Sequence, residues 1–136
     1  MWPFTTADAL SWWQGICAAV DAGTVDLLGA RLGDEWVGSA QLALEQPPNQ
    51  LHRANVRKVI VRRNARRRGV GEALMCAVEE RARALGRPLL VLDTVTGSSA
   101  ERLYERLGWT RVGVIPRQAL WPDGRFCDAT HFWKWV

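Results

Sequence analysis

The segment VIVRRNARRRGVGEAL, residues 59–74, decides the fold of this chain. It begins in a strand-like apolar run over residues 54–61, and an arginine-rich loop follows. Gly69 then opens a helix whose apolar positions recur with helical spacing as far as Leu85, and Gly86 is a good helix stop. Backbone N–H groups at a helix start are free, and the helix dipole favours an anion there. The segment therefore predicts a strand–loop–helix unit that binds a phosphate group.

The composition of the loop indicates which kind of phosphate it binds. Gly69 and Gly71 allow the backbone to approach a bulky diphosphate, and Arg67 and Arg68 add charge that reaches its outer oxygens. The GxxxxGK[ST] pattern of nucleoside triphosphatases and the GxGxxG pattern of dinucleotide oxidoreductases are both absent from the sequence. The alternative is that the arginines form a nucleic-acid patch. We favour a diphosphate cofactor over nucleic acid, because binding a phosphate backbone does not require glycines at a helix start.

Helices and strands are predicted on both sides of this unit. Thr5 or Thr6 caps a helix that runs to about residue 22, and Ser98 with Glu101 forms a capping box that opens another helix. The first helix has one apolar face, made of Leu10, Trp13, Ile16, Cys17 and Val20. The expected strands cover residues 24–32, 35–44, 54–61, 88–94, 110–114 and 126–135. Residues 1–136 are therefore predicted to form one α/β (α+β) domain, with a central mixed sheet flanked by helices.

Composition excludes several other classes of protein. The longest apolar runs are much shorter than a membrane span, and residues 1–9 lack the basic start of a signal peptide. The three cysteines have no metal-ligand or redox spacing, so we expect no metal site and a reducing cytoplasm. His52 and His131 are far apart in the sequence and are interpreted as structural. Of the eight tryptophans, we expect most to pack in the core and one or two to line a pocket.

Two segments together carry a resemblance to a known family. The segment RRRGVG, residues 66–71, resembles the Q/R-x-x-G-x-G/A acetyl-CoA signature of the GNAT family of N-acetyltransferases. About thirty residues further on, AERLYERLGW, residues 100–109, resembles the A-x-x-L-Y-x-x-L-G-F segment of the same family. The resemblance covers the chain from about residue 24 to its end. It implies the GNAT fold, acetyl-CoA as the co-substrate, and transfer of the acetyl group to a primary amine.

A narrower resemblance is to the tabtoxin-resistance acetyltransferases, which acetylate a small β-lactam amino acid toxin. The similar segments are residues 38–42, 55–59, 92–94, 97–98, 110–113 and 122–125. This resemblance implies a small antibiotic or amino-acid-like acceptor. That subfamily has a glutamate, proposed to help catalysis, where this chain has Asn55. The first strand of the family, and part of its first helical region, are expected to be missing from this chain.

The family resemblance implies a set of cofactor-binding residues. Backbone groups of the strand before the signature pair with the pantetheine arm, and amides at the helix start hold the pyrophosphate. Gly97 stands where the family commonly has an asparagine that contacts the cofactor, so that contact is lost or passes to Ser98; the alternative is that Ser98 is a plain helix cap. The implied cofactor-binding residues are Val59, Ile60, Val61, Arg66, Arg67, Arg68, Gly69, Val70, Gly71, Glu72, Ser98 and Tyr104.

The chemistry of acetyl transfer suggests three catalytic candidates. An amine attacks a thioester only when neutral, and Asp93, at the end of the apolar strand, is the candidate base. Tyr104 matches the family's general acid, which protonates the leaving thiolate, and Asn55 occupies the glutamate position. A strand N–H near Ile60 or Val61 completes the site as an oxyanion donor. Each has an alternative: Tyr104 as a core residue, Asp93 as a loop cap or bridge, and Asn55 as a hydrogen-bonding residue within the sheet.

We therefore expect direct transfer in a ternary complex to the amine of a small molecule. The alternatives are a protein N-terminus or lysine as acceptor, and a degenerate module that binds acetyl-CoA without turnover. No nucleic acid and no membrane is expected among its partners. Because the strand at residues 24–32 lacks its usual neighbour, its open edge predicts a homodimer or an N-terminal segment folded over it.

Overall fold

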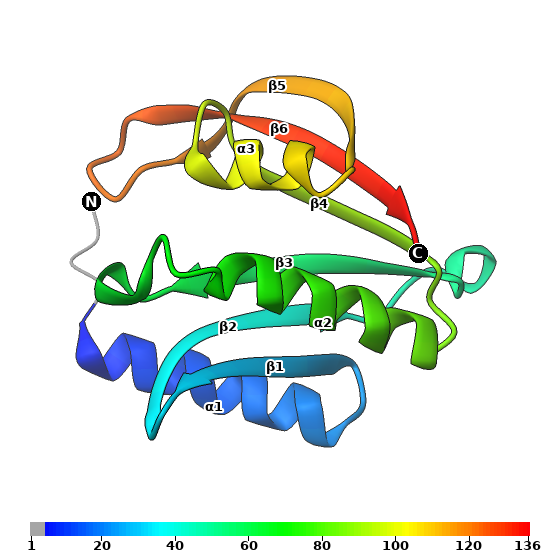
Figure 1. Cartoon of the computed structure of the whole chain (residues 1–136), viewed down its shortest axis with the longest axis horizontal. Coiled ribbons are helices and arrows are strands. Elements are labelled where there is room, and N and C mark those ends of the chain that lie inside the picture. The colour runs from blue at the N-terminus through cyan, green and yellow to red at the C-terminus, as the bar shows by residue number, and fades with distance from the viewer. Residues whose placement is uncertain (1–4) are drawn as a thin grey trace.

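The computed structural model describes residues 5–136, so residues 1–4 of the N-terminal stretch considered above lie outside it. Its elements follow the predicted order of helix, three strands, helix, strand, helix and two strands (Figure 1). They are α1 (Thr6–Asp21), β1 (Val25–Leu32), β2 (Glu35–Ala43), β3 (Arg53–Val61), α2 (Val70–Ala84), β4 (Leu89–Val95), α3 (Ser99–Arg106), β5 (Thr110–Leu120) and β6 (Phe126–Trp135). Short 3-10 turns at Pro48–Gln50 and Arg63–Ala65 precede β3 and α2.

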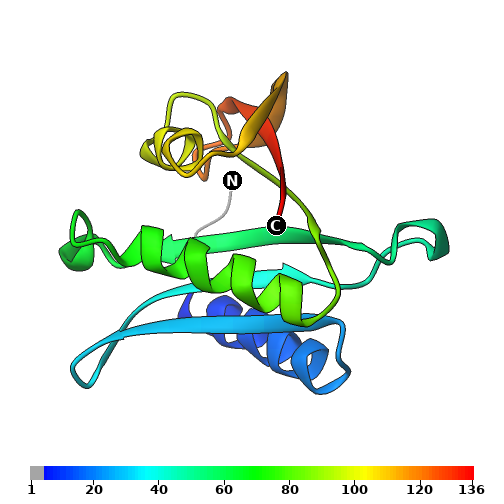
Figure 2. The ribbon, with the colours of Figure 1, turned by 45° about the vertical axis from the view of Figure 1, so that its right-hand side comes forward.

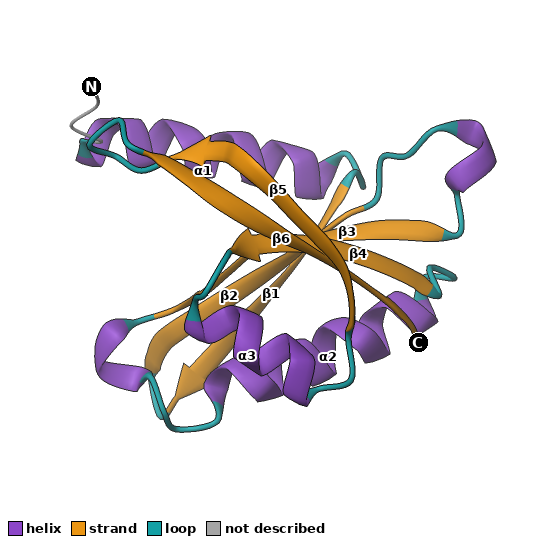
Figure 3. Cartoon of the chain, turned by 90° about the horizontal axis from the view of Figure 1, so that it is seen from above, coloured by secondary structure: helices purple, strands orange, loops and turns teal. Residues whose placement is uncertain are grey.

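The strands form one mixed sheet, as the sequence predicted. Its order is β1-β2-β3-β4-β6-β5, in which β3 and β4 run parallel and the other neighbours are antiparallel. Helices α2 and α3 cover one face of the sheet and α1 lies on the other (Figure 3). No helix within residues 5–136 is long and apolar enough to cross a membrane. The fold is that of a mixed sheet between two helical layers.

The core lies between α2, α3 and the sheet. Alternate residues of the central strands point into it and are fully buried or nearly so, as expected for strands with one face packed against helices. Its main members are Ala40, Leu42, Ala54, Val56, Leu74, Met75, Val78, Leu90, Leu92, Tyr104 and Phe132. The opposite face of the sheet, toward α1, carries the polar residues described below.

The apolar face predicted for α1 lies on a helix as expected, but most of it is exposed. Thr5 caps the helix and forms a capping box with Asp8, but Ile16 is the buried residue of the face, while Leu10 remains 60% exposed. The reason is that α1 packs mainly against β1, which lies at the edge of the sheet. An edge strand offers too little surface to bury a whole helical face.

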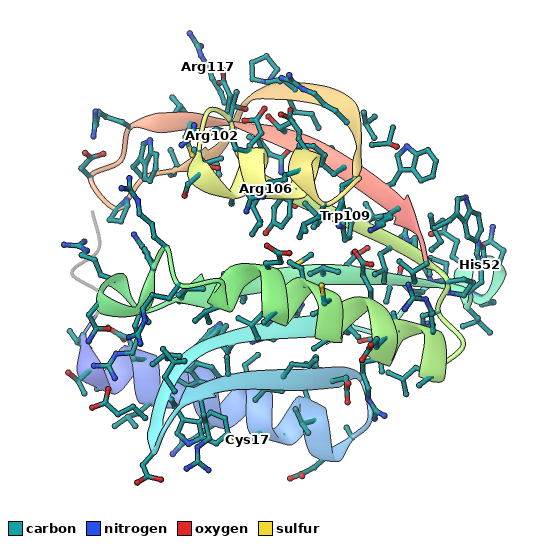
Figure 4. All side chains as sticks on the ribbon, in the orientation of Figure 1. Cys17, His52, Arg102, Arg106, Trp109 and Arg117 are labelled. Carbon is teal, nitrogen blue, oxygen red and sulfur yellow. The ribbon has the colours of Figure 1, made fainter. Side chains whose placement is uncertain are left out.

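Strand β5 is longer than predicted and contains a bulge. The pairing with β6 passes from Ile115↔Ala129 to Ala119↔Cys127, so residues 116–118 stand opposite Asp128 alone. Pro116 has no N–H to contribute to a ladder, and Arg117 has a φ of 55° with its N–H donated to Asp128 Oδ1 at 2.9 Å. The side chain of Arg117 points outward at this bulge (Figure 4). The sequence predicted that this strand ends at residue 114, shortly before Pro116, whereas the strand continues after the bulge.

Strands β3 and β4 diverge after a short parallel contact. Their register pairs are Arg53↔Leu89, Ala54↔Leu90 and Asn55↔Val91, and beyond them β3 continues to Val61 paired only with β2. A bulge between Ser39 and Gln41 on β2, with Lys58 at φ 52°, accompanies the divergence. Figure 2 shows β1–β3 with α2 below and β4–β6 with α3 above. The end of β3 therefore presents one backbone edge without a strand neighbour.

Candidate active site

The start of α2 has the backbone geometry of an anion site. Gly69 is the N-cap with φ 79° and ψ 6°, and no side chain in the described structure caps the helix. Glycine adopts this left-handed conformation without strain. Gly69 also has no side chain that could cap the helix, so the first N–H groups of α2 remain free for a ligand. Arg66 closes the loop by donating from Nε to Val61 O at 3.1 Å. The exposed Arg67 and Arg68 stand beside it and supply positive charge.

Gly71 has a packing role that the sequence did not predict. A Cβ at Gly71 would lie 3.2 Å from Leu103 Cδ2 and 4.0 Å from Val61 Cγ2. Its missing side chain would therefore face α3 and β3, not an outer ligand. Gly71 permits the close approach of α2 to α3, and the approach of a diphosphate to Gly69 or Gly71 stays a prediction.

The predicted cofactor residues from Val59 to Glu72 lie along one continuous path. Val59, Ile60 and Val61 form the free end of β3, and the loop leads from them directly into the start of α2. Ile60 is 49% exposed, whereas Val70 is buried against the core and Glu72 lies exposed in the first turn of α2. An extended ligand with a diphosphate fits this arrangement, because the uncapped helix start binds the anion and the free strand edge offers backbone hydrogen bonds. The contacts themselves stay a prediction.

Ser98 is the N-cap of α3. Its Oγ accepts the Glu101 N–H at 3.3 Å and lies 3.4 Å from Thr94 Oγ1. The Glu101 carboxylate accepts from the Gly97 N–H, one residue before the position that a capping box requires, and lies 3.6 Å from Arg111. The predicted capping box is thus only half formed. Contact of Ser98 with a cofactor stays a prediction.

Tyr104 has its ring in the core. Its centroid lies 6.0 Å from that of Trp109 and 5.9 Å from that of Phe132, and the residue is 4% exposed; Trp109 follows the end of α3 (Figure 4). Burial, with the Asp93 carboxylate nearby, raises the pKa of Tyr104 to about 12. The phenol therefore keeps its proton at neutral pH. The core packing of the ring and a catalytic hydroxyl are compatible.

Asp93 belongs to a hydrogen-bonded chain that the sequence did not predict. Gln118 Nε2 donates to Asp93 Oδ2 at 3.2 Å, and Gln118 Oε1 lies 2.5 Å from His131 Nε2. Because a carboxylate only accepts, the Gln118 amide nitrogen must face Asp93, and His131 Nε2 must carry the hydrogen. His131 is also the β6 register partner of Asp93. Gln118 was missed because it follows Pro116, beyond the predicted end of its strand.

Asn55 is the last residue of β3 that pairs with β4. Its Oδ1 is buried and accepts no hydrogen bond within the part of the chain that the structure describes. This oxygen therefore gives no support to the alternative that Asn55 is a hydrogen-bonding residue within the sheet. A catalytic role for Asn55 stays a prediction.

An apolar cavity of about 480 Å³ lies between α1 and strands β1–β3. Trp13 and Trp36 line it, as expected for one or two of the tryptophans, together with Leu27, Ile60 and Arg62. Its volume suits a small organic group. Ile60 lines this cavity and also belongs to the end of β3, where the cofactor is predicted to bind.

The chain matches the model of a known protein family. Residues 1–109 match the family model described as "Acetyltransferase (GNAT) family". This match covers more than half of the chain and includes the loop at the start of α2.

Solved structures share the fold. A ribosomal-protein-alanine N-acetyltransferase from Brucella melitensis is 24% identical with a TM-score of 0.83, over 100% of this chain and 83% of that one. A putative acetyltransferase from Salmonella typhimurium, solved with its cofactor acetyl-CoA, is 21% identical with a TM-score of 0.77, over 96% of this chain and 73% of that one. The ribosomal-protein-S18-alanine N-acetyltransferase of Escherichia coli is 18% identical with a TM-score of 0.75, over 97% and 90%. At these identities the likeness establishes the fold alone.

Proposed function

We propose, from the premise that this chain belongs to the GNAT acetyltransferase family and is an acetyl-CoA-dependent N-acetyltransferase, that its acceptor is the primary amine of a small molecule. The observation that carries the proposal is the uncapped start of α2 at Gly69 beside the free end of β3, with Asp93 on the neighbouring strand. In this arrangement the diphosphate of acetyl-CoA binds the helix start and its pantetheine arm runs along Val59, Ile60 and Val61.

The proposed reaction is direct attack in a ternary complex. The amine nitrogen forms a bond to the thioester carbonyl carbon, the C–S bond breaks, and the Asp93 carboxylate accepts the proton that the amine loses. The Tyr104 hydroxyl acts on the leaving sulfur. Since a thiol has a pKa of about 8.5 and that of Tyr104 is raised to about 12, Tyr104 stabilises the thiolate by a hydrogen bond in preference to full proton transfer. Asn55, at the glutamate position of the tabtoxin-resistance acetyltransferases, contributes on the acceptor side.

A cavity of about 480 Å³ with two tryptophans lies beside Ile60 of the proposed cofactor path, although Asp93 is not among its lining residues, and its volume suits part of a small acceptor. The resemblance to tabtoxin-resistance acetyltransferases supports an antibiotic or amino-acid-like toxin as that acceptor. A second candidate is the N-terminal alanine of a ribosomal protein, because two of the similar structures carry that name. The three free cysteines fit a cytoplasmic location for either function.

We also propose a homodimer, formed through the edge strand β1. That strand lies at one end of the sheet and pairs with β2 on its inner side. At the other end, Pro116 and the bulge break up the edge of β5, which is a common protection against pairing. Light scattering should give a dimer. A monomer whose β1 amides exchange quickly would contradict this.

The test of the proposed function is an acceptor screen that follows the release of free CoA. It should include tabtoxinine-β-lactam, aminoglycosides, polyamines, amino acids, and a peptide with the N-terminus of a ribosomal protein. Turnover with a small amine and none with the peptide would support the proposal. Turnover with the peptide alone would favour the second candidate, and none with any amine would leave only a module that binds acetyl-CoA.

A further inference from the structure

Two oppositely charged side chains lie where β3 and β4 separate. Arg57 and Asp93 each stand two residues beyond the last register pair, Asn55↔Val91. The residues just before them, Val56 and Leu92, are buried in the core on the α2 side, at 4% exposure each. Because side chains alternate along a strand, Arg57 and Asp93 share the opposite face of the sheet. A positive and a negative group therefore stand on the two sides of the divergence.

Arg57 is oriented by a buried amide. Gln41 is fully buried, and its Oε1 accepts from Arg57 Nε at 3.1 Å. Since a guanidinium only donates, this bond fixes the orientation of the Gln41 amide, and its Nε2 is left without a partner in the described residues. The bond uses only Nε, so the two terminal nitrogens of the exposed Arg57 remain as donors. They form the fork that matches a carboxylate.

Asp93, on the other strand, also accepts from an amide, although this one is exposed. The Gln118 amide donates to it, and His131 holds Gln118 in turn. Within residues 5–136, Arg57 and Asp93 form no ion pair with each other, whereas Arg81 and Asp26 pair closely at 2.7 Å. Arg57 and Asp93 are thus each oriented by an amide and do not neutralise one another. This pair suits a ligand that carries both a positive and a negative charge.

We propose that Arg57 binds a carboxylate of the acceptor, so that the acceptor is a small zwitterion of the amino-acid type. Its amine faces Asp93, and its carboxylate binds the terminal nitrogens of Arg57. This inference rests on the proposed function, since it assumes that the acceptor enters from this face of the sheet. Arg57 then determines specificity. A peptide N-terminus has an amide where this site requires a carboxylate.

The first test compares matched acceptors with the wild-type protein. The common L-amino acids, β-alanine and γ-aminobutyrate are each assayed for CoA release beside their carboxamides and their decarboxylated amines. We expect the best acid to exceed its carboxamide by about 10- to 100-fold in kcat/KM, the usual worth of a hydrogen-bonded charge pair. Equal rates for acid and carboxamide, or turnover with carboxylate-free amines alone, would overturn the inference.

The second test uses variants. Arg57→Gln should raise the KM of the preferred acid by about 10- to 100-fold with little change in kcat, and should remove the preference over the carboxamide. Arg83→Gln is the matched control, an exposed arginine at the far end of α2 that pairs with Glu79 at 3.9 Å; it should leave both constants unchanged. An unchanged preference in Arg57→Gln would also overturn the inference.

Acetyl-CoA binding separates the failure of this inference from that of the proposed function. Arg57→Gln should bind acetyl-CoA as the wild type does, because the diphosphate lies at the start of α2. If acetyl-CoA binds and amines without a carboxylate are acetylated, the enzyme function stands and only the zwitterion is wrong. If no amine is acetylated by the wild type, the proposed acceptor chemistry fails as a whole.

Discussion

At Tyr104, replacement by phenylalanine removes only the hydroxyl. The ring contacts with Trp109 and Phe132 remain, so the melting temperature should change little. If the hydroxyl stabilises the leaving sulfur, kcat should fall by about 100- to 10,000-fold, while the affinity for acetyl-CoA stays constant. Steady-state kinetics and calorimetric titration of Tyr104→Phe check this. Nearly full activity would mean that Tyr104 serves only the core.

Asp93 is the second residue at which proton transfer can be tested. Asp93→Asn keeps an oxygen that accepts from Gln118 but removes the basic carboxylate. The rate of this variant depends on the fraction of acceptor amine that is already neutral. This fraction grows as pH rises toward the pKa of an alkylamine, about 10. The kcat/KM profile should therefore shift to higher pH, and high pH should rescue Asp93→Asn but not Tyr104→Phe. A profile that only drops in height would contradict the assignment of Asp93 as the base.

At the scale of the element, the two ends of α2 allow a matched comparison. Gly69 and Gly86 flank the helix with φ 79° and 71°, and a Cβ at either would meet nothing within 4 Å. Alanine at each position should cost about 1–2 kcal/mol of stability through backbone strain. Only Gly69→Ala should also weaken acetyl-CoA binding, by about 10-fold, since its methyl group would lie at the proposed diphosphate site. Equal affinities in the two variants would place the phosphates elsewhere.

Gly71 is a poor site for such a test because of its neighbours in α3. A side chain there meets Leu103 of α3, so a substitution such as Gly71→Asp disturbs the packing of two helices together with any ligand contact. Loss of binding in that variant would not separate the two causes. Gly69 has no such neighbour, which is why the comparison with Gly86 isolates the ligand.

For the whole molecule, acetyl-CoA should stabilise the native state. A ligand that binds only the folded chain adds about 2.7 kcal/mol at 100 times its dissociation constant, which corresponds to a rise of several degrees in melting temperature. Desulfo-CoA should protect about as well, because the diphosphate and pantetheine arm make the proposed contacts. Thermal unfolding with each compound measures this, and no shift at millimolar acetyl-CoA would contradict the cofactor path.

The sequence by itself determined the strand–loop–helix unit, the order of the elements and the family. These depend on neighbours along the chain: Gly69 sets a left-handed cap, the loop arginines lie beside it, and the apolar period of α2 follows. Only the tertiary structure decided that Arg57 and Asp93 stand on one face, that Gln118 reaches Asp93 and His131, and that Gly71 faces α3. Strand order, register and the β5 bulge bring those residues together, and each of these depends on contacts between residues distant in the chain, which no local pattern encodes.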